Sequence, residues 1–366
     1  MKIGILTFHR ADNFGAALQT FALQKFLIDN GHNAFVIDYR CKKIEEVYYI
    51  ISPKILFSRK NIIKAINSYM KNLFVFKEMH EKHKKYEIFR HEYLNLTESF
   101  YKIKNDLDFD AYIAGSDQIW NFALLGGINK YYLLDFPIKD EALKISFSAS
   151  SEIAAFPLFI KNQDKIKRCL KDFDFISVRE LFLKEELYKY TNKEISVTLD
   201  PTFLIRKEIY DKILIRPKEN QYVLIYHMAE TNEAIELAKQ IAISNNTNKI
   251  IQIHASFKSP KGKNHKRDLG PLEILGYIKY ANAIVTNSFH GAALSIILEK
   301  NFWVINTYKS SRLKSLLNNA GLESRYIKSI SDYKCEDIDY NLVNSKLNPA
   351  IEYSKQFIIN ALNNKK

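Results

Sequence analysis

Short apolar runs alternate with helical segments along most of the chain, and this alternation constrains the fold most. The first forty residues form one such unit: the strand-like run KIGILTF, a turn at 13–15, a helix over 16–30 that Gly31 ends, and the strand-like run AFVIDY. Two strands that flank one helix form a right-handed crossover and pair in parallel. The pattern predicts an α/β fold with a parallel sheet.

The alternation runs twice through the 366 residues, which is the length of two ordinary domains. Apolar strand-like runs are found at 111–115, 145–150, 175–180 and 196–200, and after Pro201 at 222–228, 249–255, 283–288 and 302–307. We therefore predict two Rossmann-like domains that face a cleft, at 1–205 and 206–340, with a C-terminal helix or tail at 341–366.

The segment 41–105 interrupts the first series. Basic and aromatic residues interleave over 53–93, which predicts one or two amphipathic helices inserted into the first domain. One interpretation is that these helices contact a membrane surface that carries a lipid-linked acceptor. The other is a buried aromatic stripe with solvated charged faces, which is favoured because runs of charge usually face solvent.

Composition limits the partners and the compartment. The formal net charge of +13, from 54 Lys and Arg against 41 Asp and Glu, favours anionic partners or reflects a lysine-rich proteome. No nucleic-acid signature accompanies this charge, so no nucleic-acid partner is expected. Three separated cysteines form no pair, and no leader or membrane-spanning run occurs; we expect a cytoplasmic protein. No His, Asp or Glu set has ligand spacing, so no metal is expected.

The segment AIVTNSFHGAALSIIL carries the strongest candidate site. A strand ends at Thr286, and a helix begins after Asn287, Ser288, His290 and Gly291. The free N–H groups of a helix start bind anions, and a histidine there can transfer a proton near neutral pH. We predict that His290 is catalytic and that Asn287, Ser288 and Gly291 bind the donor; the alternative is a histidine that caps a helix.

A second cluster, AGSDQIWN, follows the strand at 111–115. Asp117 is a candidate general base, while Gln118 and Trp120 have the amide and the aromatic ring that suit a sugar. The alternative is a helix N-cap at residue 116 or 117.

In the first turn, Asn13, Gly15 and Gln19 are predicted to point into the cleft and to contact the acceptor. The turn lacks GxGxxG, so no dinucleotide is expected. An ordinary turn into a helix is the alternative.

Two arginines are candidates for holding an anion, because a guanidinium binds carboxylate and phosphate in bidentate fashion. Arg179 follows a strand, Arg312 starts a helix, and Lys309 lies close to Arg312 in sequence. Surface ion pairs, such as one between Arg179 and Glu180, are the alternative. The basic loop 257–268 is interpreted as a mobile lid or, more simply, as a solvated loop.

Taken together, these motifs resemble the polysaccharide pyruvyl transferase family. The segments that carry the resemblance are NFGAALQTFAL, GSDQIWN, SFSASSE, SVRE, LDPTFL, TNSFHGAALSIILEKNFWVI and RLKSLLNNAGLESR. It spans residues 3 to about 325 and is weakest over 41–105. Many relatives have Arg-Leu where this chain has Ser288-Phe289, so Arg179 or Arg312 is the candidate replacement.

The resemblance implies a GT-B-like fold with an acceptor side in the first domain and a donor side in the second. It implies phosphoenolpyruvate as co-substrate, no cofactor, and a pyruvate ketal on a sugar of a surface polysaccharide or its lipid-linked precursor. His290 takes the position of the family's functional histidine. Alternatives are a nucleotide-sugar glycosyltransferase of the same fold and a non-catalytic carbohydrate-binding relative.

Overall fold

A computed structural model gives the fold of the chain. It describes residues 1–48, 62–102, 107–228, 230–255, 262, 264–305 and 311–364, with the backbone alone for residue 48 and for 62–76.

The first sheet has six parallel strands in the order β2-β1-β3-β4-β5-β6. Its strands are β1 (Lys2–Leu6), β2 (Asn33–Val36), β3 (Ala111–Ala114), β4 (Leu143–Ala149), β5 (Phe175–Val178) and β6 (Ile195–Val197). The helices of this half are α1 (Phe14–Asp29), α2 (Lys42–Tyr48), α4 (Ile62–Tyr93), α5 (Phe156–Lys161), α6 (Gln163–Asp172) and α7 (Leu181–Leu187). β1 is buried from its second residue on, as a central parallel strand requires.

The second sheet also has six parallel strands, in the order β12-β11-β10-β7-β8-β9. Its strands are β7 (Val223–His227), β8 (Ile250–His254), β9 (His265–Lys266), β10 (Ala283–Thr286), β11 (Phe302–Ile305) and β12 (Tyr326–Ile327). The helices that follow the first sheet are α8 (Lys207–Ile213), α9 (Asn232–Ser244), α10 (Pro271–Tyr280), α11 (Phe289–Ile297), α12 (Ser311–Ala320) and α13 (Tyr340–Asn363). The predicted pair of Rossmann-like α/β sheets is confirmed.

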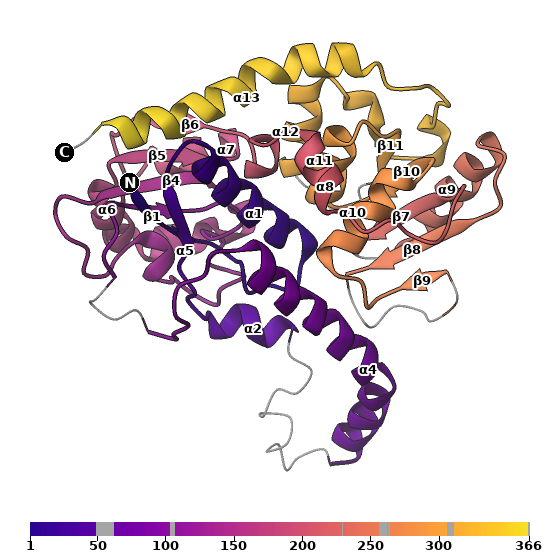
Figure 1. Cartoon of the computed structure of the whole chain (residues 1–366), viewed down its shortest axis with the longest axis horizontal. Helices are drawn as coiled ribbons and strands as arrows, with labels where there is room; N and C mark the ends of the chain where they lie inside the picture. Colours follow the sequence, from indigo (N-terminus) through magenta and orange to yellow (C-terminus); the bar gives the residue numbers. More distant parts are fainter. Residues whose placement is uncertain are drawn as a thin grey trace.

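The two halves share one apolar core. Helix α1 of the first half packs against α10 and α11 of the second, and Figure 1 shows α1 at the junction of the halves. Leu18 of α1, Leu275 of α10 and Ala293 of α11 are all buried in this core. The division into 1–205, 206–340 and 341–366 stays a proposal, with one sheet on each side of residue 205.

The C-terminal helix α13 connects the two halves a second time. It starts on the second half, where Leu347 is buried, and runs back along the first half (Figure 1). There the Ser354 hydroxyl accepts a hydrogen bond from the Leu199 N–H at 2.9 Å, and the Tyr353 hydroxyl donates to Ser196 Oγ at 2.8 Å. This helix therefore fixes the end of the first sheet relative to the second.

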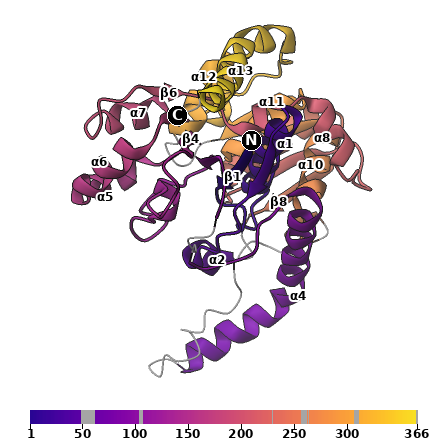
Figure 2. The ribbon, with the colours of Figure 1, turned by 60° about the vertical axis from the view of Figure 1, so that its left-hand side comes forward.

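The predicted insertion contains α2 and the 32-residue helix α4, which projects from the body at its N-terminal end (Figure 2). At its other end Tyr86 and Phe89 are buried in the shared core. Lys85 Nζ lies 2.8 Å from Glu273 Oε1 of α10, so α4 also contacts the second half. In the described part of the chain, no helix combines the length and apolar character needed to cross a membrane.

Candidate active site

His290 lies in the first turn of α11, directly after the carboxyl end of β10. The Ser288 hydroxyl caps this helix by accepting from the Gly291 N–H at 3.3 Å. A Cβ on Gly291 would lie 2.5 Å from Thr286 Oγ1, so a glycine is needed there. Asn287 Oδ1 accepts from the Met228 N–H at 2.8 Å. Ser288, Gly291 and Asn287 thus shape the turn, and their contact with a donor stays a prediction.

Asp200, which the sequence analysis did not select, joins the two halves of the site. It follows β6 and caps the short 3₁₀ helix Pro201–Phe203, because its Oδ1 accepts from the Thr202 N–H at 3.0 Å. Its Oδ2 lies 2.7 Å from Arg179 Nη2 and 3.4 Å from His290 Nε2. Arg179, Asp200 and His290 therefore form one charged cluster between the first sheet and α11.

The Arg179–Asp200–His290 cluster is nearly closed to solvent. The side chains of Arg179 and Asp200 are 3% and 0% exposed, and that of His290 is 10% exposed. Burial acts to raise the pKa of Asp200, but the charge of Arg179 and the contacts with His290 and the Thr202 N–H outweigh burial and hold that pKa well below its usual value. Asp200 is therefore an ionised carboxylate at neutral pH.

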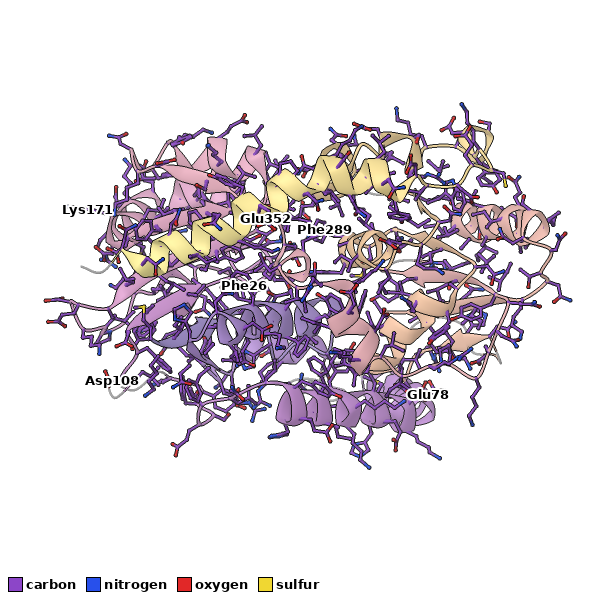
Figure 3. All side chains as sticks on the ribbon, turned by 45° about the horizontal axis from the view of Figure 1, so that its top comes forward. Phe26, Glu78, Asp108, Lys171, Phe289 and Glu352 are labelled. Atoms are coloured by element: carbon purple, nitrogen blue, oxygen red, sulfur yellow. The ribbon has the colours of Figure 1, made fainter. Side chains whose placement is uncertain are left out.

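Arg179 has the surroundings of an anion-binding group. It is buried, its partner is Asp200, and the alternative of a surface ion pair with Glu180 is wrong. The guanidinium lies over the Phe289 ring, 4.7 Å from its centroid, and Figure 3 shows Phe289 near the middle of the molecule. Its Nε and Nη1 have no hydrogen-bond partner among the described residues. Unpaired buried donors are costly, and an anion would satisfy them.

Gln19 lies behind the site and is fully buried. It donates to Thr7 Oγ1 at 2.8 Å and accepts from the Ser116 N–H at 3.3 Å, while Ser116 Oγ accepts from Arg179 Nη2 at 2.6 Å. Gln19 thus supports Ser116 and, through it, Arg179. Its predicted position in the open cleft is replaced by this supporting role.

The structure also changes the interpretation of AGSDQIWN. Trp120 is 1% exposed and its indole N–H donates to the Tyr132 carbonyl at 3.0 Å. Its ring is thus part of the core, and the prediction that it stacks on a sugar is wrong. A loop, not an α-helix, follows Asp117, so the helix N-cap alternative is wrong as well. Asp117 has a φ of 69°, and its Oδ1 accepts from the Gln118 N–H at 2.8 Å.

The first turn meets His290 directly. Asn13 caps α1, with its Oδ1 accepting from the Gly15 N–H at 2.9 Å and the Ala16 N–H at 3.2 Å. A Cβ on Gly15 would lie 2.1 Å from His290 Nδ1. Glycine at position 15 therefore gives room to an imidazole from the other half of the molecule.

Arg312 also connects the two halves. Its Nη2 lies 2.7 Å from Glu152 Oε1. With its amide oxygen turned toward Arg312, Gln118 accepts from Nη1 at 3.0 Å and from Nη2 at 3.2 Å. Glu180, next to Arg179 in sequence, is fully buried and accepts from the Ser150 hydroxyl at 2.8 Å. Burial raises the pKa of Glu180 to about 7.

The remaining predictions are tested in part. Lys309 lies outside the described residues, as do 257–261 and 263 of the predicted lid. In the described end of that loop, Arg267 is paired with Glu78 and Lys266 with Glu219. Across the described residues, no group of three or more His, Cys, Asp or Glu could hold a metal ion.

The sequence analysis overlooked Asp200 and Glu180, although both follow strands at the carboxyl edge of the first sheet. The same criterion selected His290. Applying that criterion to LDP and SVRE would have identified them.

Comparison with known proteins gives one match at the family level. Residues 13–309 match the model of the polysaccharide pyruvyl transferase family. No curated protein sequence matches the chain. Similar solved structures include UDP-GlcNAc 2-epimerase from Neisseria meningitidis bound to UDP-GlcNAc, with 10% identity, a TM-score of 0.45, and coverage of 100% of this chain and 95% of that one. The spinosyn rhamnosyltransferase SpnG has 9% identity, a TM-score of 0.38, and coverage of 100% and 97%. No ligand or activity is inferred from either.

Proposed function

The chain belongs to the polysaccharide pyruvyl transferase family, and from this we propose that phosphoenolpyruvate is its donor and a sugar diol its acceptor. Membership in this family supports the transfer of pyruvate to a polysaccharide as the activity. The proposal adds that pyruvate ends as a ketal and that phosphate leaves.

The observation that carries the proposal is the cluster of Arg179, Asp200 and His290 between the halves. Arg179 has two buried nitrogens without partners among the described residues, and the N-terminus of α11 lies beside it. Phosphoenolpyruvate carries both a carboxylate and a phosphate, which such donors bind. The ionised carboxylate of Asp200 offsets the positive charge of Arg179.

The proposed reaction uses these residues in defined roles. His290 donates a proton to the methylene carbon of the donor, which becomes the methyl group of the ketal. One sugar hydroxyl attacks the central carbon and loses its proton to Asp117, and the C–O bond to phosphate breaks. The second hydroxyl then closes the ketal and its proton leaves with phosphate.

Two rivals make different predictions. A nucleotide-sugar glycosyltransferase would be stabilised by UDP- or GDP-sugars, and a non-catalytic carbohydrate-binding protein would release no phosphate. We expect phosphoenolpyruvate, and none of the nucleotide sugars, to raise the melting temperature of the wild type. We also expect phosphate release when a suitable saccharide is added.

Pairs of variants test whether phosphoenolpyruvate binds at the Arg179–Asp200–His290 cluster. Arg179→Lys should abolish the melting shift, because a lysine is a point charge without the planar fork. Arg168→Lys, a surface residue with a 62% exposed side chain, is the control and should leave the shift intact. His290→Ala should lower turnover on the order of 100-fold or more, while His91→Ala, 70% exposed on α4, should not. Wild-type turnover in a folded His290→Ala variant would refute the mechanism.

The lipid linkage of the acceptor and a membrane contact of residues 53–93 stay predictions. In the described end of this segment, Tyr86 and Phe89 are buried in the protein core and are not available for such a contact.

A further inference from the structure

We propose that Asp200 fixes a proton on Nε2 of His290, so that Nδ1, on the Gly15 side, is the nitrogen that exchanges protons with the substrate. Asp200 is then a positioning residue, and Gly15, which has no side chain, lets the Nδ1 edge of the ring lie against the first turn. The role of Nδ1 rests on the proposed function, whereas the position of the proton does not.

The carboxylate of Asp200 has little freedom to turn. Its Oδ1 accepts two hydrogen bonds from Thr202, at 3.0 Å from the N–H and 2.7 Å from Oγ1. Its Oδ2 lies 2.7 Å from Arg179 Nη2 and 3.4 Å from His290 Nε2, and neither Oδ2 nor Nε2 has a hydrogen-bond partner among the described residues. An ionised carboxylate accepts and never donates. The imidazole nitrogen that faces it, Nε2, is therefore the one that carries hydrogen in the neutral ring.

The imidazole itself is held in this orientation. The rings of Phe14 and Phe289 lie 6.4 and 5.2 Å from its centroid, both edge-on. Its Nδ1 faces Gly15, where a Cβ would lie only 2.1 Å from Nδ1 and 2.2 Å from Cγ. The Gly15 N–H is already bonded to Asn13 Oδ1, so it does not compete for Nδ1. No described residue forms a hydrogen bond with Nδ1, whereas the fully buried ring nitrogen without a partner is Nε2, so we assign Nδ1 to the substrate.

This arrangement defines the proton path. In the imidazolium form, the Nδ1–H bond breaks, its proton forms a C–H bond with the π electrons of the enol, and the neutral ring keeps Nε2–H toward Asp200. Asp117 takes the proton that the sugar hydroxyl loses. That proton is then returned to the imidazole, which regains its starting charge. Two hydroxyl protons are lost in all, one reaching the methyl group and one the phosphate.

Nitrogen NMR of the full-length protein labelled in histidine tests the position of the proton without turnover. We expect the neutral His290 ring to show a protonated Nε2 and an unprotonated Nδ1. In Asp200→Asn, Arg179 holds the amide oxygen and the NH₂ group faces the ring, so the proton should move to Nδ1. An exchange of this kind lowers kcat about 10⁴-fold in serine proteases, and we expect a loss of that order.

A second buried His–Asp–Arg group provides the matched control. His9 Nε2 lies 2.9 Å from Asp38 Oδ1, and Arg10 also pairs with Asp38. Asp38→Asn should change the signals of His9 and leave those of His290 unchanged. A neutral His290 protonated on Nδ1 in the wild type, or unchanged His290 signals in Asp200→Asn, would overturn the proposal. If the signals agree but no phosphate is released from phosphoenolpyruvate, the proposed function fails and the Asp200 assignment stands.

Gly15→Ala tests the contact between the ring and the first turn by a different measurement. In the wild-type background, the new methyl group should collide with the imidazole and lower the midpoint of urea unfolding. In a His290→Ala background the same substitution should cost much less, because the ring is gone. An equal midpoint shift in both backgrounds would show that position 15 does not depend on the imidazole.

Discussion

Glu180 shows how burial can shift the pKa of a carboxyl group next to a charged site. One of its oxygens accepts from the Ser150 hydroxyl, and the other has no hydrogen-bond partner among the described residues. Burial raises its pKa to about 7, although the charges of Arg179 and Arg312 act in the opposite direction. A carboxyl group of this kind changes its charge in the range where enzymes usually work.

This pKa predicts how stability depends on pH. In the unfolded chain Glu180 loses its proton near pH 4.5, whereas in the folded protein it keeps the proton up to about pH 7. The folded state therefore binds more protons between these values, and the contribution of Glu180 to stability falls as pH rises through this window. A shift of this size corresponds to roughly 3 kcal/mol.

Glu180→Gln removes the titrating group. The difference in unfolding free energy between this variant and the wild type should grow in favour of the variant from pH 5 to pH 7.5, then stay constant. Urea unfolding at a series of pH values measures this. A difference that is equal at pH 5 and pH 7.5 would show that Glu180 ionises normally.

At the scale of elements, α4 has an apolar side that becomes part of the core and charged residues that bind neighbours. Phe89 is 1% exposed and packs against Phe21 of α1 at 6.3 Å between ring centroids. Arg90 Nη2 lies 2.9 Å from Asp12 Oδ1 in the first turn. The buried aromatic stripe that the sequence analysis favoured is thus present in the described end of the helix.

Two adjacent substitutions in α4 separate core packing from helix propensity. Phe89→Ala should lower the unfolding free energy by about 3–5 kcal/mol, because it opens a cavity in the shared core. Ile88→Ala, at a position that is 44% exposed, should change it by less than about 1 kcal/mol. Chemical denaturation of both variants measures these values, and similar losses would place the buried side of α4 elsewhere.

At the scale of the whole molecule, the two sheets form one unit because several elements cross between the halves. Helix α1 packs on α10 and α11, α13 returns to the first sheet, and the Arg312–Glu152 pair connects α12 with the loop after β4. The candidate site depends on this arrangement, since Arg179 and Asp200 come from one half and His290 from the other.

A double-mutant cycle measures the contact of Arg312 with Glu152 across the halves. Both side chains are partly buried, at 16% and 30% exposure, so we expect a coupling energy of about 1 kcal/mol between Arg312→Ala and Glu152→Ala. The exposed pair Lys43–Glu46 within α2 is the control, with an expected coupling of a few tenths of a kcal/mol. A coupling across the halves no larger than the control would show that this ion pair does not stabilise the junction of the halves.

The sequence by itself determined the repeated strand–helix units, because apolar periodicity reflects which side of each element is buried. It also identified His290, since a histidine after a strand end and before a run of small residues is a local pattern. The capping of helices by Asn13 and Ser288 is also a local feature, because a cap bonds to N–H groups two or three residues away, although the sequence analysis assigned these residues to the acceptor and the donor instead.

Only the tertiary structure decided which side chains meet. Trp120 looked suited to a sugar, but its burial depends on elements distant in sequence. Asp200 lies 90 positions before His290 in the sequence, and Gly15 is 275 positions away, so their contacts with the imidazole exist only once the two halves pack. The charge of Asp200 follows from that packing, because desolvation and partner distances are properties of the assembled core.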